Sequence, residues 1–305
     1  MAVFFAEGNA RRRGKIEYRD GYVALLGRRL HYLDYGGAGE IVVALHGYVQ
    51  NAHAFDGVAA ALVPHRHLLA LDIRGRGRSD WGPPECYRMN YYLQDLRDFF
   101  SVLGLSRFAL IGTSMGGTLA LLYAIAHPLE VTRLVLNDVT ANTNRAAVVR
   151  TSLKFGFAPL EFASILDAIV WFRAERENLG SLDEEAQLAW VRHFLAPTES
   201  GSFRFDCDPA LLELARKIQP GIGPRGRAYR RMAMEQARRL QMPVLILRGA
   251  YSDVVPRENL RVMAGLLPAG SWTEVPGVGH SPTLYEPAAR NALCQFFGVG
   301  GMSTT

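Results

Sequence analysis

The sequence has few cysteines and no pattern that would pair them. Its 305 residues include three, Cys86, Cys207 and Cys294. An odd number without short spacings argues against a disulfide framework and against a cysteine metal site. We therefore expect three reduced thiols with a structural role.

Long apolar runs are also missing. No stretch approaches the roughly 18 residues that a membrane-spanning helix needs. At the start of the chain, Val3–Phe5 is too short for the apolar part of a signal peptide, and the basic run Arg11–Arg13 follows it instead of preceding it. These absences predict a soluble, cytoplasmic protein.

Several ligand-binding motifs are absent as well. Gly75-Arg-Gly77 lacks the Gly-Lys-Ser/Thr ending of a phosphate loop, so we expect no nucleotide cofactor. The net charge of +5 is spread along the chain without interleaved aromatic residues, which argues against nucleic acid as a partner. No metal is expected, because metal-ligand spacings are missing among His53, His65, His67, His127 and His193.

The chain does contain a regular alternation of strand and helix signals. Two apolar segments on either side of Gly27-Arg28 predict an opening hairpin. Short apolar runs predict buried strands at 41–45, 68–71, 107–111, 133–136, 243–247 and 271–275. Helical spacing of apolar residues predicts helices at 90–100, 118–125 and 284–297. This alternation is typical of a mostly parallel α/β sheet of roughly eight strands, covered by helices on both faces.

Ser114 stands where one of these strands turns into a helix. The turn reads Gly112-Thr-Ser-Met-Gly-Gly117, and its glycines let the strand and the helix approach closely. A serine at such an apex is strained and exposed, and the first N–H groups of the helix favour negative charge beside it. Ser114 is therefore the candidate nucleophile, with a noncatalytic glycine-rich turn as the alternative on this motif alone.

Two loops near the carboxyl end hold the groups that a serine nucleophile needs. His280 follows the predicted strand 271–275, and an imidazole can accept the serine proton near neutral pH. Asp253 follows the preceding strand, and a carboxylate there would orient the imidazole and stabilise its charged form.

The order serine, aspartate, histidine, each after a different strand, resembles the α/β-hydrolase superfamily. Two other segments carry the same resemblance, His46-Gly-Tyr48 and Asp72-Ile-Arg-Gly-Arg-Gly-Arg-Ser79. The resemblance extends over residues 20–298. It implies that the backbone N–H groups of Tyr48 and Met115 bind an oxyanion, and that the segment 72–79 braces the loops beneath the site.

The resemblance leaves two aspartates as possible third members of the triad. Some members of the superfamily carry the acid after the strand that is followed here by Asp138. The turn Arg248-Gly-Ala-Tyr-Ser-Asp253 resembles the usual acid loop, so Asp253 is favoured. The predicted triad is Ser114, Asp253 and His280.

About a hundred residues separate the strand 133–136 from the strand that begins at 243, far more than an ordinary connection. Helical patterns and many aromatic residues predict an inserted helical cap at 140–239. The hydrolase core would then comprise 16–139 and 240–299, with flexible tails at 1–15 and 300–305. We expect most cap aromatics to pack together and two or three to line a pocket for an acyl or aromatic group.

Together these residues imply acyl transfer through an acyl-enzyme, without a cofactor. Small-molecule carboxylic esters with small to medium apolar or aromatic acyl groups are the leading substrates. Carbon–carbon bond hydrolysis of ring-cleavage products comes second, because Ser281 stands where such enzymes commonly have tryptophan. Lactonase, amidase and perhydrolase activities are further alternatives, as is a ligand receptor that retains the triad.

Overall fold

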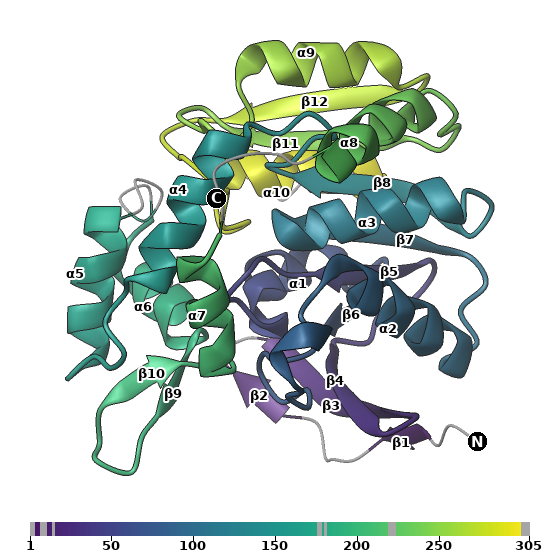
Figure 1. The fold of residues 1–305 in the computed structure, drawn as a ribbon. Coiled ribbons are helices and arrows are strands. Elements are labelled where there is room, and N and C mark those ends of the chain that lie inside the picture. The colour runs from purple at the N-terminus through teal and green to yellow at the C-terminus, as the bar shows by residue number, and fades with distance from the viewer. Residues whose placement is uncertain are drawn as a thin grey trace.

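The structure is a computed structural model, and it describes residues 4–6, 11–13, 16–175, 179, 182–218 and 224–299. Within these residues a central sheet has the strand order β1-β3-β4-β6-β5-β7-β8-β11-β12, and β2 also pairs with β3 (Figure 1). Its strands are β1 (Phe4–Ala6), β2 (Arg11–Arg13), β3 (Ile16–Leu25), β4 (Arg28–Asp34), β5 (Ile41–Leu45), β6 (His67–Leu71), β7 (Phe108–Thr113), β8 (Val131–Asn137), β11 (Val244–Gly249) and β12 (Gly270–Val275).

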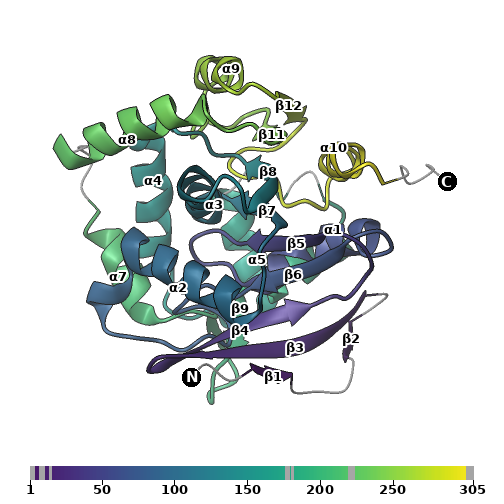
Figure 2. The ribbon, with the colours of Figure 1, turned by 90° about the vertical axis from the view of Figure 1, so that its right-hand side faces the viewer.

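Helices cover both faces of this sheet, as the sequence predicts. Figure 2 shows α1 (Asp56–Leu62) and α10 (Pro287–Phe297) on one face, and α2 (Met89–Val102) and α3 (Met115–Ala126) on the other. In sheet order the strands β6, β5, β7, β8, β11 and β12 pair in parallel, and every residue of β7 and β11 is buried. Parallel strands covered on both faces need such continuous apolar runs. No helix among the described residues has both the length and the apolar character required to cross a bilayer.

The amino-terminal edge of the sheet corrects one prediction. β1 and β2 lie within the predicted tail 1–15, yet both pair antiparallel with β3. The ten-residue strand β3 offers backbone hydrogen-bonding groups along its outer edge, and strands of three residues can use them although they are too short to show any periodicity. The other predicted tail, 300–305, lies outside the described residues.

The long insertion between β8 and β11 is mainly helical. It contains α4 (Arg145–Gly156), α5 (Ile165–Glu175), α6 (Glu184–Arg192), the hairpin β9 (Leu195–Pro197) and β10 (Phe203–Phe205), α7 (Pro209–Arg216) and α8 (Pro224–Ala237). Figure 1 shows α4 to α7 and the hairpin beside the sheet, whereas α8 contacts α3 and α9 (Arg257–Leu266). We therefore place α8 with the helices of the core, which shortens the predicted cap at its carboxyl end.

Aromatic side chains form the interior of this cap. Ring centroids lie between 5.0 and 6.1 Å apart in a cluster of tilted and edge-to-face pairs made by Phe155, Phe162, Trp171, Phe172 and Phe205. Such contacts add about 0.5–1.5 kcal/mol per pair beyond the burial of apolar area. The expectation that most cap aromatics pack together agrees with these contacts. The three cysteines are buried free thiols.

Candidate active site

Ser114 occupies a strained turn between β7 and α3. Its backbone has φ 51° and ψ −111°, a conformation that an L-residue adopts only when its surroundings impose it. The neighbouring glycines explain how the turn closes. A Cβ at Gly116 would overlap the Leu45 carbonyl of β5, and one at Gly112 would lie 2.5 Å from both the Gly116 carbonyl oxygen and the Gly117 Cα. The helix and the strand can meet only without side chains at these positions.

A chain of two hydrogen bonds connects Ser114 to a buried carboxylate. The Ser114 Oγ lies 2.8 Å from His280 Nε2, and His280 Nδ1 lies 2.7 Å from Asp138 Oδ2. Asp138 is fully buried and also accepts hydrogen bonds from the Ser252 hydroxyl at 2.7 Å and the Gly249 N–H at 3.2 Å. A carboxylate on Nδ1 keeps the proton there, which leaves Nε2 free to accept the serine proton.

Asp253 is not part of this arrangement, so the predicted position of the acid was wrong. Its side chain is 57% exposed and pairs with Arg150 of α4 at 2.5 Å. β8 and β11 are neighbours in the sheet, so the turns after them meet at the same edge. Asp138 has φ 55° in its turn and bonds to His280, whereas Asp253 bonds outward to the cap.

The loop after β5 brings Tyr48 next to Ser114, and both line one cavity. Hydrogen bonds of His46 hold this loop: Nδ1 donates to the Gly47 carbonyl at 2.7 Å and Nε2 accepts from the Ile73 N–H at 2.9 Å. Burial lowers the pKa of His46 to about 4, so the ring is neutral at physiological pH. Gln50 Oε1 accepts the Gly47 N–H at 2.8 Å, which holds the peptide between His46 and Gly47.

Met115 supplies the second predicted donor. It is the first residue of α3, where backbone N–H groups have no acceptor within the helix. Both predicted oxyanion residues thus line the cavity that Ser114 lines, Tyr48 from the loop after β5 and Met115 from the start of α3.

The segment 72–79 braces these loops, as the resemblance implies. Asp72 accepts the N–H of Ala52 at 2.6 Å and contacts His31 Nδ1 at 2.7 Å. Arg74 makes two hydrogen bonds to Asp95, at 2.8 and 2.5 Å. The segment is therefore attached to β4, to the turn before α1 and to α2.

Arg76, within the same segment, makes contacts that the sequence did not reveal. Its side chain is fully buried, and its Nε donates to the Tyr48 carbonyl at 2.8 Å. Its other nitrogens donate to the Arg74 carbonyl at 2.8 Å, to the Tyr92 hydroxyl at 2.6 Å and to the Met115 sulfur at 3.6 Å. One guanidinium thus contacts both residues of the predicted oxyanion site.

We expect Arg76→Met to lower kcat/KM for an aryl ester by about 10- to 100-fold, because displacing a positioning group by an ångström can cost that much. The melting temperature should also fall, since two buried carbonyls lose their donor. The matched control is Arg78→Met in the same segment, whose side chain is 48% exposed and bonds to Asp20. Wild-type turnover by Arg76→Met would contradict the bracing role.

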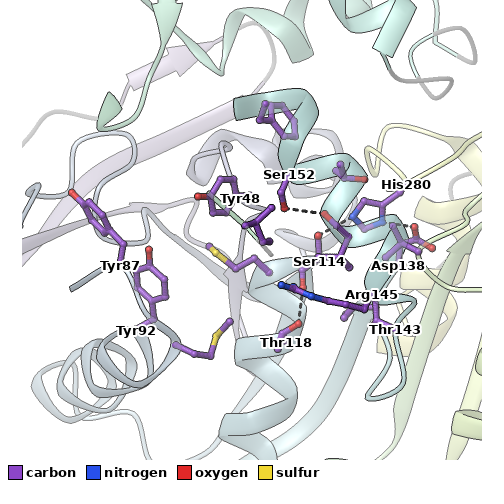
Figure 3. A pocket seen from close by; sticks show the side chains of 18 residues that line it. Tyr48, Tyr87, Tyr92, Ser114, Thr118, Asp138, Thr143, Arg145, Ser152 and His280 are labelled. Carbon is purple, nitrogen blue, oxygen red and sulfur yellow. Dashed lines mark hydrogen bonds and ion pairs between the residues drawn. The ribbon is translucent and has the colours of Figure 1, made fainter. Parts of the chain in front are cut away.

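The cavity above Ser114 has a volume of about 360 Å³ and lies between the core and the cap (Figure 3). Met89, Val139, Val148, Phe155 and Val254 make much of its lining apolar. A second, smaller cavity of about 20 Å³ adjoins Ser114 and His280 next to Gly47 and Ser281.

A histidine pair elsewhere was not visible in the sequence. His53 and His193 stack at 4.7 Å between centroids, and each has a nitrogen 3.2 Å from Asp56 Oδ2. The three side chains offer ligand atoms within 4.8 Å of one another. The ring planes differ by only 17°, so a single ion could not lie in both planes without rotation of a ring. This cluster joins the core to the cap.

Comparison with known proteins identifies the family of this chain. Residues 40–287 match the family described as alpha/beta hydrolase fold. The 3-hydroxybutyrate-oligomer hydrolase of Cupriavidus necator is 30% identical over 275 residues, which are 88% of this chain and 92% of the relative. An alpha/beta hydrolase from Novosphingobium aromaticivorans has a TM-score of 0.83 at 29% identity, covering 93% of this chain and 99% of that one.

The E-2-(acetamidomethylene)succinate hydrolase structure has a TM-score of 0.77 at 22% identity, over 92% of this chain and 100% of that one, and so shares the fold. With a family match across most of its length and relatives that are hydrolases, the chain belongs to the alpha/beta hydrolase fold family and is an enzyme of that family.

Proposed function

We propose that the protein is a serine hydrolase that cleaves carboxylic esters of small to medium acyl groups through a covalent acyl-enzyme. The observation that carries this proposal is the hydrogen-bonded chain from Ser114 through His280 to Asp138, with the serine facing a cavity. A pure binding protein has no need for a strained, activated hydroxyl at that position.

In the proposed reaction, His280 Nε2 takes the hydroxyl proton as Ser114 Oγ attacks the ester carbonyl. The carbonyl oxygen becomes an oxyanion and receives hydrogen bonds from the backbone N–H groups of Tyr48 and Met115. His280 then gives its proton to the departing alcohol, and the acyl group stays on Ser114. Water, deprotonated by His280, attacks the acyl-enzyme, and His280 returns that proton to Ser114 Oγ as the acid leaves. Asp138 stabilises the imidazolium in both steps.

Two observations support short to medium acyl groups. The cavity of about 360 Å³ is at the small end of the range for ligand sites, and much of its lining is apolar. The relative from Cupriavidus necator is named for hydrolysing 3-hydroxybutyrate oligomers. Esters of short acids, including hydroxy acids, are therefore the substrates that we propose to test first.

We expect kcat/KM for 4-nitrophenyl esters to peak between acetate and octanoate and to fall for palmitate, because the cavity is too small for a long chain. A ring-cleavage diketone assayed alongside tests carbon–carbon hydrolysis, and multiple turnovers per enzyme molecule distinguish catalysis from ligand binding. A profile independent of chain length would contradict a cavity-limited substrate.

Phe155→Ala provides a structural test of the same idea. Phe155 is 4% exposed, comes from α4 of the cap and lines both cavities. Its removal should move the optimum toward longer acyl groups while a small fluorophosphonate still labels Ser114. Loss of labelling together with ester turnover would instead mean that the variant damages the turn that holds Ser114.

A further inference from the structure

Arg145 brings a guanidinium into the cavity that holds the nucleophile. It is the first residue of α4, it is half-buried, and Figure 3 shows its side chain extending from the helix across the cavity. Among the described lining residues, Arg145, His280 and Asp138 are the ones that carry charge near neutral pH or during the reaction. Asp138 accepts hydrogen bonds from His280, Ser252 and Gly249, and it is the one carboxylate among the described lining residues.

Most hydroxyl groups of the cavity have their protons directed elsewhere. Thr143 donates to the Thr140 carbonyl at 2.6 Å, Ser152 to the Val148 carbonyl at 2.9 Å, and Thr118 to the Ser114 carbonyl at 3.4 Å. Tyr48 and Tyr87 donate to the Leu211 carbonyl and to Asp208. The guanidinium offers a ligand the largest set of donors, because it has five N–H groups and can keep a bond within the protein while it binds a ligand.

We propose that Arg145 binds a carboxylate of the substrate, so that the preferred substrates are esters that carry a free carboxylate group. This inference rests on the proposed ester hydrolysis and names its substrate class. The planar guanidinium matches a carboxylate in two-pronged hydrogen bonding. An apolar, partly enclosed cavity strengthens that attraction relative to water. Because the cavity is small, a substrate with its ester carbonyl at Ser114 lies within a few bonds of Arg145.

The experiment compares two esters of similar length, 4-nitrophenyl hydrogen glutarate, which carries a carboxylate, and 4-nitrophenyl hexanoate, which does not. Arg145→Ala should lower kcat/KM for the glutarate ester by about 30- to 100-fold, mainly through KM, because truncating one partner of a buried charge pair is costly. The hexanoate ester should change by less than about threefold. Arg145→Lys keeps the charge without the planar fork and should fall between the wild type and Arg145→Ala.

The matched control is Arg150→Ala on the same helix. Arg150 is 56% exposed, pairs with Asp253 and does not line the cavity. Its loss should leave the preference between the two esters unchanged. If Arg145→Ala lowers turnover of both esters equally, or of neither, carboxylate recognition by Arg145 is wrong.

A binding measurement separates this inference from the proposed function. Glutarate is titrated into Ser114→Ala protein by calorimetry, with and without Arg145→Ala, so that no turnover is required. Arg145→Ala should weaken glutarate binding at least about tenfold. Arg145-dependent binding without turnover of any ester by the wild type would retain the carboxylate site and refute ester hydrolysis. Glutarate affinity that is the same with and without Arg145, or glutarate binding to neither protein, would overturn the carboxylate site.

Discussion

Asp138→Asn is expected to lower kcat for ester hydrolysis by about 10⁴-fold, as loss of the orienting carboxylate does in serine triads. The side chain accepts the His280 Nδ1 proton at 2.7 Å. An amide has the same shape, but it can present its NH₂ group to Nδ1. The imidazole would then carry its proton on Nε2, and a protonated Nε2 cannot accept the proton of the Ser114 hydroxyl. Steady-state kinetics with 4-nitrophenyl butyrate measure the loss, and circular dichroism confirms folding.

Asp253→Asn is the matched control for this prediction. Its carboxylate is exposed and its partner is Arg150, and ion pairs of this kind contribute at most about 1 kcal/mol. We expect its kcat to stay within about twofold of the wild type. The reverse result, an inactive Asp253→Asn and an active Asp138→Asn, would return the acid to the position that the sequence favoured.

Ser114→Ala should abolish ester turnover. Its kcat should fall by about 10⁶-fold, which is the loss that removal of the nucleophile causes in a serine triad. The alanine lacks the oxygen that forms the acyl-enzyme, while the turn between β7 and α3 and the cavity stay in place. Because the hydroxyl is half-buried and makes one side-chain hydrogen bond, to His280, the melting temperature should change little.

Covalent labelling provides the direct readout for the same residue. A fluorophosphonate should add one phosphonyl group to Ser114 Oγ with loss of fluoride, and intact-mass analysis should show one adduct on the wild type and none on Ser114→Ala. An adduct on another residue of the folded enzyme, or turnover near the wild-type level by Ser114→Ala, would refute the proposed nucleophile.

The local sequence pattern was enough to locate the turn at Ser114 and most of the core. The apolar run that becomes β7, the small residues at Gly112 and Gly116 and the helix-forming run after them lie within about twenty positions. The secondary-structure preferences of these residues act within the same short stretch of chain that forms the strand, the turn and the helix. For this reason the strands, the hairpin of β3 and β4, and the positions of Ser114 and His280 could be predicted before the sheet was assembled. Short strands such as β1, β2, β9 and β10 carry too few residues for a pattern and were missed.

The choice of acid depended on contacts between distant residues. Asp138 and Asp253 both lie between Ser114 and His280 in the chain, and both follow strands that end at the same edge of the sheet. The order serine, aspartate, histidine therefore fits either one. His280 bonds to Asp138, which lies 142 positions away. The backbone of its turn directs the Asp138 side chain to His280, whereas Asp253 is directed to Arg150 of α4.

The same dependence on distant contacts explains why the sequence did not reveal the contacts of Arg76 and Arg145. In the sequence Arg76 is one of three arginines in the segment 72–79, and Arg145 is one of many along the chain. Packing buries Arg76 against Tyr48 and Met115 and brings Arg145 from α4 into the cavity that Ser114 lines. The surroundings of each guanidinium come from segments that are distant in the sequence and meet only in the folded chain.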